Sequence, residues 1–295
     1  MLVGEHWMYA YASVIGNSHT LDSKPCQDHC RVEHYEGFSI AVVCDGAGSC
    51  VHSDIGSKAT TELAVYRFQE AISDLAWDGE KERPTLEGWK EVAKKTLLDV
   101  RNDLEEFASH EGLEFKSLSC TVIVAIRLMD ALLLTHIGDG RAGYCNANDE
   151  WFPLMTPFRG KEANETVFIT SDIWDAGVLD TYLESVLIQE EIKAFCLLTD
   201  GCEKASFECN LFDSEKGTFY DPNRPYKEFF HKNVTTNLPA FWSLGMTQME
   251  INQRWAEFLT SGNARLKMEP DDKTMVLAVR KANQTISLDG ATGTA

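Results

Sequence analysis

Strand-like segments follow one another in this 295-residue chain with no room for a helix between them. Residues 119–127 (SCTVIVAIR), 131–138 (ALLLTHIG) and 140–148 (GRAGYCNAN) are largely apolar and are separated only by short turns. Parallel neighbours would need a long crossover connection, so this spacing predicts an antiparallel meander. Two helical patterns, 53–72 and 86–110, also follow one another. The expected class is therefore α+β with packed antiparallel sheets, because an alternating βαβ fold would not group its elements in this way.

Further strands are predicted along the whole chain, which favours a single domain. They cover residues 7–16, 38–44, 165–172, 194–201 and 271–281. The sequence contains neither an internal repeat nor a low-complexity linker, so one domain is expected over residues 1–282. Within that domain, about residues 202–269 are predicted to form either a helical insertion or a segment that contains a flap. Residues 283–295, rich in Thr, Gly and Ala, are predicted to be a disordered tail.

The charge of the chain argues against two classes of partner. The sequence has 46 acidic and 27 basic residues, which give a formal net charge of −19. Nucleic acids and anionic membranes are bound by clustered Lys and Arg, which an acidic chain of this kind lacks. No apolar run approaches the roughly 18 residues of a membrane span. We therefore expect neither nucleic acid nor a membrane as a partner.

The cysteines and the first residues of the chain favour a reducing compartment. The nine cysteines are odd in number and include no Cys-x-x-Cys pair, which argues against a disulfide framework and against a structural zinc site. The N-terminal residues have no basic n-region and carry Glu5 and His6, unlike a secretory signal. A cytoplasmic location is expected.

At four places a strand-like segment meets an aspartate. Asp45, Asp139 and Asp200 follow strands and are each followed by glycine, whereas Asp271 precedes the last strand. Each aspartate alone would be interpreted as a turn cap. An antiparallel neighbour brings the start of one strand beside the end of another, so the four acids are expected at one edge. Gathered carboxylates repel unless a cation neutralises them, and an all-oxygen ligand set favours Mg²⁺ or Mn²⁺.

Six motifs occur in the order typical of a known family and span about residues 11–279. They are CQD (26–28), VVCDGAGS (42–49), SCTVIVAI (119–126), HIGDGRAG (136–143), LLTDG (197–201) and DDKTMVLA (271–278). In these motifs the chain resembles the metal-dependent Ser/Thr protein phosphatases of type 2C, the PPM family, and especially its bacterial members. The resemblance implies two central antiparallel β-sheets flanked by helices, a four-layer α-β-β-α sandwich with a dinuclear metal centre at one end.

The resemblance also implies roles for individual metal-binding residues. Asp45 would bridge two divalent ions, and Gly46 would offer its backbone carbonyl. Asp200 and Asp271 would complete the core cluster, and Asp139 would help to hold a third, weaker ion. The implied cofactor is thus Mg²⁺ or Mn²⁺, as two ions or three.

Four further positions lie near the implied centre, where the resemblance concerns the orientation of the attacking water and the protonation of the leaving group. Asp28 would be oriented toward a metal-bound water. Gln27 stands where many members have Glu, which makes that water contact neutral. Ala47 replaces the His that serves eukaryotic members as a general acid, so the leaving group would need another proton source. Asp272 stands where Asn is common, and it is expected either behind the ligands or in solvent.

The residue that would grip the substrate phosphate is the third departure from the family pattern. The expected Arg falls at Ser23 in this chain. Lys24 or His19 could serve in its place, although a solvated turn is an equally good explanation of His19. Both stay candidates on the sequence alone.

The function that the resemblance implies is hydrolysis of phospho-Ser and phospho-Thr monoesters in proteins by a metal-bridging water. A phosphoprotein substrate is the implied partner, with a cognate Ser/Thr kinase or its targets. The departures at Gln27, Ala47 and Ser23 motivate an alternative, a low-activity or inactive regulatory module that binds a partner. A metal-dependent nuclease is a third possibility, which the negative charge disfavours.

Overall fold

Two five-stranded antiparallel sheets lie face to face in the computed structural model, which describes residues 7–75, 77, 84–158, 166–175 and 177–281. The first sheet has the order β2 (His29–His34), β3 (Phe38–Cys44), β4 (Val122–Leu128), β5 (Leu132–Ile137), β8 (Glu184–Ile188). The second has the order β1 (Trp7–Val14), β14 (Lys273–Arg280), β9 (Ile192–Leu198), β6 (Arg141–Asn146), β7 (Trp151–Pro153). Every pairing within both sheets is antiparallel, as the sequence predicts. The predicted meander is wrong beyond its first pair, because β5 pairs with β8 and β6 lies in the second sheet.

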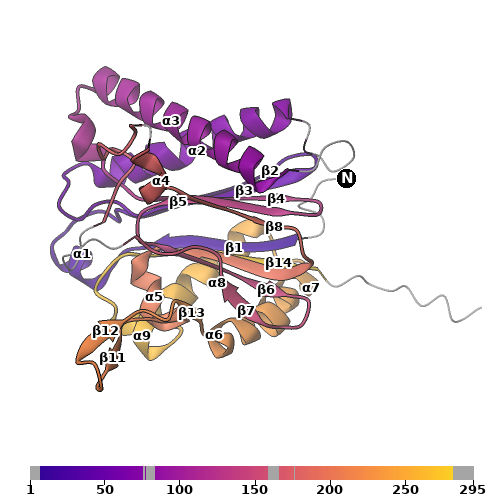
Figure 1. The fold of residues 1–295 in the computed structure, drawn as a ribbon. Coiled ribbons are helices and arrows are strands. Elements are labelled where there is room, and N and C mark those ends of the chain that lie inside the picture. The colour runs from indigo at the N-terminus through magenta and orange to yellow at the C-terminus, as the bar shows by residue number, and fades with distance from the viewer. Residues whose placement is uncertain (1–6, 76, 78–83, 159–165, 176, 282–295) are drawn as a thin grey trace, which may run out of the picture.

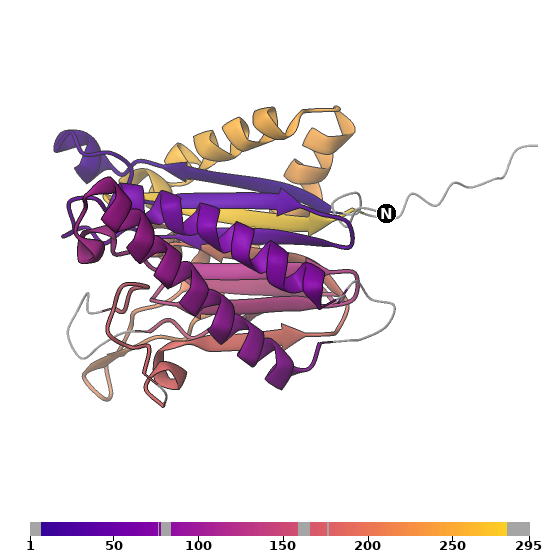
Figure 2. The ribbon, with the colours of Figure 1, turned by 90° about the horizontal axis from the view of Figure 1, so that it is seen from above.

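Helices cover the outer face of each sheet and complete four layers (Figure 1). The long pair α2 (Ser53–Asp74) and α3 (Leu86–Glu111) packs on the first sheet. The second sheet is covered by a group of shorter helices, α5 (Glu203–Ser206), α6 (Lys227–Lys232), α7 (Leu238–Ser243), α8 (Gln248–Ser261) and α9 (Ala264–Met268). Figure 2 shows the first pair crossing the strands from above. The predicted α-β-β-α sandwich is confirmed, and within the described ranges no helix is both long and apolar enough to cross a bilayer.

The continuous apolar run of β3 is explained by burial on both of its faces. Ile40 and Val42 point into the core between the first sheet and its helices. Ala41 and Val43 point into the core between the two sheets. An exposed face would require polar residues at alternate positions, and β3 has no exposed face.

A buried tryptophan ties each helical layer to its sheet. Trp89 of α3 is fully buried and donates from Nε1 to the Leu134 carbonyl at 2.8 Å. Trp255 of α8 donates from Nε1 to the Met275 carbonyl at 3.0 Å. Each indole therefore buries a large apolar ring and still satisfies its single donor. Helix α3 ends at Gly112, whose φ of 68° suits glycine, at the place that the sequence indicated.

The strand predicted over residues 165–172 is wrong for the described residues 166–172. These residues form turns, and the edge of the first sheet is taken by β8 instead. The segment is apolar because Ile169 is fully buried over the end of β4, where its N–H donates to the Cys120 carbonyl at 3.0 Å. The predicted tail, 283–295, lies outside the described residues.

The segment over residues 202–269 contains more than helices. A short hairpin, β11 (Leu211–Asp213) and β12 (Thr218–Tyr220), extends away from the sandwich in Figure 1. The pair β10 (Phe207–Glu208) and β13 (Arg224–Pro225) closes the base of this hairpin. Five short elements complete the described chain: α1 (Asn17–Leu21), α4 (Leu179–Tyr182), 3-10 helices over Phe115–Leu118 and Asp200–Cys202, and a π-helical turn over Asn233–Asn237.

Candidate metal centre

A cavity of about 230 Å³ lies at the end of the sandwich where α1 packs (Figure 1). All five residues predicted as metal ligands line it, namely Asp45, Gly46, Asp139, Asp200 and Asp271. Asp28 and His19, two of the three predicted catalytic residues, line it as well. The third, Lys24, is exposed and is not part of the lining.

Strand pairing brings these acids together from distant parts of the chain. Strand β14 pairs antiparallel with β9, so Asp271 at the start of one lies beside Asp200 at the end of the other. Strand β6 also pairs antiparallel with β9, which places Asp139 at the same edge. Asp45 follows the end of β3 in the facing sheet. The cavity therefore lies where both sheets end.

The backbone around Asp45 continues the strand instead of forming a capped turn. Its carbonyl accepts from Thr121 N at 2.8 Å, and its N–H donates to Thr121 Oγ1 at 3.1 Å. Gly46 forms an isolated antiparallel bridge with Cys120. Among the described residues, no backbone N–H donates to the Asp45 carboxylate, as it would in a turn cap. The side chain is left to face the cavity.

Gly46 is required by a close approach of neighbouring backbone. A Cβ at this position would lie 2.5 Å from the Gln27 carbonyl oxygen and 2.8 Å from the Ser53 carbonyl oxygen. Any larger residue would therefore push apart the loop that carries Gln27 and the start of α2. The sequence suggested a different reason for this glycine, namely access to its own carbonyl.

The carboxylates repel one another strongly in the absence of a cation. Burial raises the pKa of Asp45 well above its usual range, and the charges of Asp28, Asp200, Asp139 and Asp271 raise it further. Burial also raises the pKa of Asp28 well above its usual range. The pKa of Asp200 is raised to about 7, again mainly by burial, and then by neighbouring carboxylates. This excess of negative charge is what a divalent ion would neutralise.

The donor set fits hard divalent cations that keep part of their water. Within the described ranges, no group of three or more His, Cys, Asp or Glu side chains is arranged so that it could hold a metal ion without further ligands such as water. The acids instead line a cavity, and Mg²⁺ in particular keeps several waters when carboxylates bind it. The lining offers carboxylate and carbonyl oxygens with no thiolate, which does not suit zinc.

Gln27 and Asp28 present acceptors for a water in the cavity. Gln27 Nε2 donates to Ser53 Oγ at 2.7 Å, whereas its Oε1 is buried and has no hydrogen-bond partner among the described residues. Asp28 Oδ2 accepts from Thr199 Oγ1 at 2.7 Å. A buried acceptor without a donor is costly, so a donor such as a bound water is expected at Gln27 Oε1.

Asp272 lies behind the proposed ligands, which is one of the two positions that the sequence allowed for it. It is 2% exposed and accepts from the N–H groups of Gly16 and Gln27, both at 2.6 Å. Its Oδ2 also lies 2.9 Å from His19 Nδ1, although out of line for a hydrogen bond. Asp272 thereby holds the loop that carries His19 and Gln27 against the start of β14.

Two other lining residues could not have been found from their sequence pattern. Thr166 and Phe168 belong to the segment that was predicted as a strand, and they line the cavity from the turn that replaces it. Thr121 and Thr199 are hydrogen-bonded to Asp45 and Asp28, and they lie within the motifs SCTVIVAI and LLTDG. Their place inside these motifs was the available signal for the two residues.

Comparisons with known proteins agree with this architecture. A family model described as Protein phosphatase 2C matches residues 15–241. A rice protein (Oryza sativa subsp. japonica), "Probable protein phosphatase 2C 73", is 30% identical over 77 residues, which are 26% of this chain and 18% of the rice protein. The matched stretch thus spans less than a fifth of that relative.

Solved structures show the same fold at low sequence identity. The crystal structure of a bacterial serine phosphatase has a TM-score of 0.59 and 14% identity, and the match covers 95% of this chain and 100% of the other. The serine/threonine phosphatase PstP/Ppp of Mycobacterium tuberculosis has a TM-score of 0.56 and 12% identity, covering 94% of this chain and 100% of that one. At these identities the likeness concerns the fold.

Proposed function

Because the chain belongs to the protein phosphatase 2C family, we propose that it is a metal-dependent phosphatase of phospho-Ser and phospho-Thr monoesters in proteins. One observation carries the proposal. Asp45, Asp139, Asp200 and Asp271 come from four separate strand ends and line a single cavity. Removing one of these acids is the direct test, and its expected result opens the Discussion.

The proposed metal ligands are Asp45, the Gly46 carbonyl, Asp200 and Asp271 for two Mg²⁺ or Mn²⁺ ions, with Asp139 for a third. When bound, such ions screen the phosphate charge and lower the pKa of a water so that it can attack phosphorus. Carboxylates around the cavity offset the charge of the ions. No side chain has to act as the nucleophile.

Asp28 and Gln27 are proposed to orient the attacking water. Thr199 Oγ1 occupies one oxygen of Asp28 and so restricts the rotation of its carboxylate. The unpartnered Oε1 of Gln27 can accept a hydrogen bond from the same water. Ala47 lines the cavity without any acidic proton, so the leaving alkoxide takes its proton from water.

His19 is the proposed contact for the substrate phosphate. Lys24 was the other candidate, and it does not line the cavity. Among the described lining residues His19 is the one whose side chain can carry a positive charge, and Asp272 lies 2.9 Å from its Nδ1. These contacts leave Nε2 as the ring nitrogen available to a phosphate oxygen.

Replacing His19 by alanine is expected to raise KM for p-nitrophenyl phosphate about tenfold with a smaller change in kcat, since a ground-state phosphate contact is lost. Steady-state kinetics with Mn²⁺ check this result. The Lys24→Ala variant, which removes an exposed charge outside the cavity, is the matched control and should behave as the wild type. A KM increase in Lys24→Ala with an unchanged His19→Ala would reverse the assignment.

Metal binding is expected to stabilise the protein more at about pH 8 than at about pH 5.5. The folded-state pKa of Asp200 is raised to about 7, so the folded protein keeps a proton that the unfolded chain has already released above about pH 4. The contribution of Asp200 to stability is therefore largest at low pH and falls as the pH rises toward 7. Bound cations remove this penalty and compete with protons for the same oxygens.

Thermal unfolding with EDTA or with millimolar Mg²⁺ or Mn²⁺ measures this effect at both pH values. The increase in Tm should be larger at the higher pH, and Asp45→Asn should diminish it. Equal increases at both pH values, or none, would contradict a cation site among these acids.

The low-activity alternative was motivated by the departures at Gln27, Ala47 and Ser23. Gln27 has an unpartnered acceptor and lines the cavity, and His19 lines it with a side chain that can carry a positive charge. The departures at Gln27 and Ser23 therefore each have a candidate residue, and water is the proposed proton source in place of the residue missing at Ala47. We therefore favour turnover. We further propose phosphoproteins made by a Ser/Thr kinase as substrates and a reducing cytoplasm as the location, since all nine cysteines are free thiols.

A further inference from the structure

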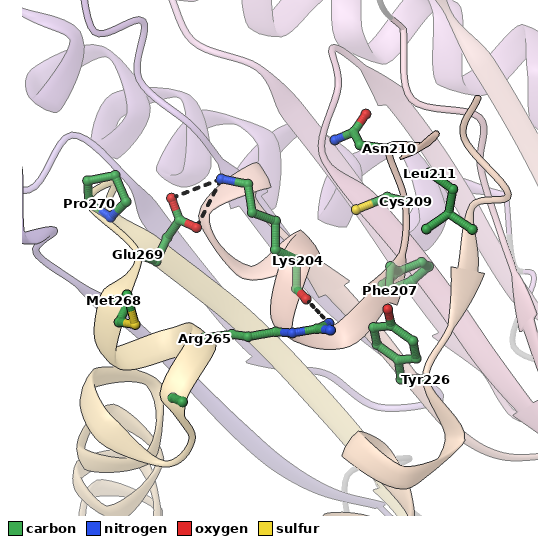
Figure 3. Close-up of a pocket in the computed structure, with 11 residues that line it drawn as sticks. Lys204, Phe207, Cys209, Asn210, Leu211, Tyr226, Arg265, Met268, Glu269 and Pro270 are labelled. Carbon is green, nitrogen blue, oxygen red and sulfur yellow. Dashed lines mark hydrogen bonds and ion pairs between the residues drawn. The ribbon is translucent and has the colours of Figure 1, made fainter. Parts of the chain in front are cut away.

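A second cavity, of about 590 Å³, lies beside the candidate metal centre and is shown in Figure 3. Its walls are mainly apolar, with Phe207, Leu211, Tyr226 and Met268 among the lining residues. Lys204 and Arg265 add two cationic side chains. The cavity is therefore large enough for a bulky side chain and combines apolar contact area with positive charge.

The chain connects this cavity directly to the metal centre. Pro270 lines the cavity and is bonded to Asp271, one of the proposed ligands. Lys204 lies on α5, four residues after Asp200, which is about one helical turn or roughly 6 Å along the axis. A ligand that fills both cavities would need to span only a few residues of extended chain.

One wall of the cavity is held rigidly by a buried arginine. Arg141 of β6 is fully buried and lies two residues after Asp139. Its guanidinium donates to Glu203 at 2.9 Å, to Asp221 at 2.6 Å and to Asn223 at 2.6 Å. These charge-assisted bonds attach the hairpin segment, residues 203–223 with the β11–β12 hairpin inside it, to β6 at both of its ends. The wall that Phe207 and Leu211 form is thus preorganised.

The charge in the cavity is not fully compensated. Lys204 Nζ lies 3.1 Å from Glu269 Oε2 and so has a carboxylate partner. Arg265 is exposed, donates to the Lys204 carbonyl at 2.6 Å and lies over the Tyr226 ring at 5.2 Å (Figure 3). Among the described residues, no carboxylate lies within 4.0 Å of the Arg265 guanidinium. In a chain of net charge −19, an arginine without an acidic partner is available to an acidic ligand.

We propose that this cavity is an accessory subsite for the phosphoprotein, and that it takes a bulky apolar residue adjacent to an acidic residue, about three or four positions from the phosphorylated one. The apolar side chain lies against Leu211, Tyr226 and Met268. The neighbouring carboxylate pairs with Arg265. This inference rests on the proposed function for the phosphorylated end of the substrate. The hairpin segment, which the sequence predicted to contain a flap, thereby contributes to the choice of substrate.

The first test compares phosphopeptides with a substrate too small to reach the subsite. In one peptide Leu-Glu occupies the third and fourth positions after phosphoserine, and in a second peptide it occupies the third and fourth positions before phosphoserine. Each has a matched peptide with Ser-Gln at the same positions. Wild-type kcat/KM should be about fivefold higher for one Leu-Glu peptide than for its Ser-Gln match. In Arg265→Gln this preference should fall at least about twofold, because the carboxylate contact is lost whereas the leucine contact remains. The kcat/KM for p-nitrophenyl phosphate is the reference in every variant.

Matched variants distinguish the loss of the contact between Arg265 and the peptide carboxylate from a change in the fold. Arg265→Lys keeps the charge and should retain part of the preference. Lys267→Gln makes the same charge change on an exposed neighbour in α9 that does not line the cavity, so the preference should remain. Equal kcat/KM for all peptides in the wild type, or an equal loss in Lys267→Gln, would overturn the proposal.

The second test does not depend on catalysis. Fluorescence anisotropy with unphosphorylated, labelled peptides in EDTA should give about fivefold weaker binding for Arg265→Gln than for the wild type with a Leu-Glu peptide. If these peptides bind in this way but the phosphopeptides are not dephosphorylated in Mn²⁺, the proposed function is refuted and the subsite stands. If the phosphopeptides are dephosphorylated but all variants bind the labelled peptides equally well, the subsite alone is refuted. Absence of any binding by the wild type would also refute it.

Discussion

Replacing Asp45 by asparagine is expected to lower kcat/KM for p-nitrophenyl phosphate and for a phosphothreonine peptide by at least about a thousandfold, or about 4 kcal/mol of transition-state stabilisation. Asparagine has nearly the same shape but lacks the charge that would bridge two cations. The backbone of Asp45 is held by Thr121, and those bonds do not involve the carboxylate. The fold should therefore survive the substitution.

The same substitution is expected to increase the stability of the metal-free protein, although it lowers activity. The pKa of Asp45 is raised, so its ionised form destabilises the metal-free folded protein at neutral pH. Asparagine removes that charge, and the Tm of Asp45→Asn in EDTA should exceed that of the wild type. Asp74→Asn is the matched control, because Asp74 is an exposed aspartate at the end of α2 that lies far from the cavity. Near wild-type activity in Asp45→Asn would refute the acidic cluster as the catalytic centre.

Replacing Gly201 by alanine is expected to destabilise the protein by roughly 3 kcal/mol and to abolish most of the activity. A Cβ at this position would lie 1.9 Å from the carbonyl oxygen of Asp272 and 3.0 Å from its carbonyl carbon. Both atoms are backbone, so the start of β14 would have to move away from the end of β9. That movement separates Asp200 from Asp271, which are both proposed metal ligands.

Urea unfolding and activity measurements on the same preparation test both parts of this prediction. Gly48→Ala is the stability control, because the nearest atom to its new Cβ would be Gln27 Oε1 at 3.9 Å. Its effect on the free energy of unfolding should stay within about 0.5 kcal/mol. If Gly201→Ala were as stable as Gly48→Ala, the close approach of the two strands would be wrong.

Elements with strong local signals were predictable from the sequence. The bounds of β4, β5 and β6 were predicted within a few residues from apolar segments separated by short turns. The meander itself was right only for β4 and β5, because the turn after Ile137 takes the chain into the other sheet, where β6 pairs with β9 and β7. The strands β2 and β8 were missed because both lie at sheet edges and are only partly buried. Residues 166–172 were misassigned because an apolar loop packed on a core has the same composition as a strand.

The sequence by itself determined which oxygen donors the cavity contains, because ligand chemistry belongs to residue types and their positions at strand ends. The grouping of strands and helices also determined the α+β class with packed antiparallel sheets, and the resemblance in the motifs implied the four layers. Tertiary structure alone decided that His19 and Gln27 meet Asp272, more than 240 residues away, through contacts of 2.9 and 2.6 Å. It alone placed Arg265 in a cavity behind Asp271. Contacts between such distant residues depend on how loops pack after the sheets form, and no local pattern records that packing.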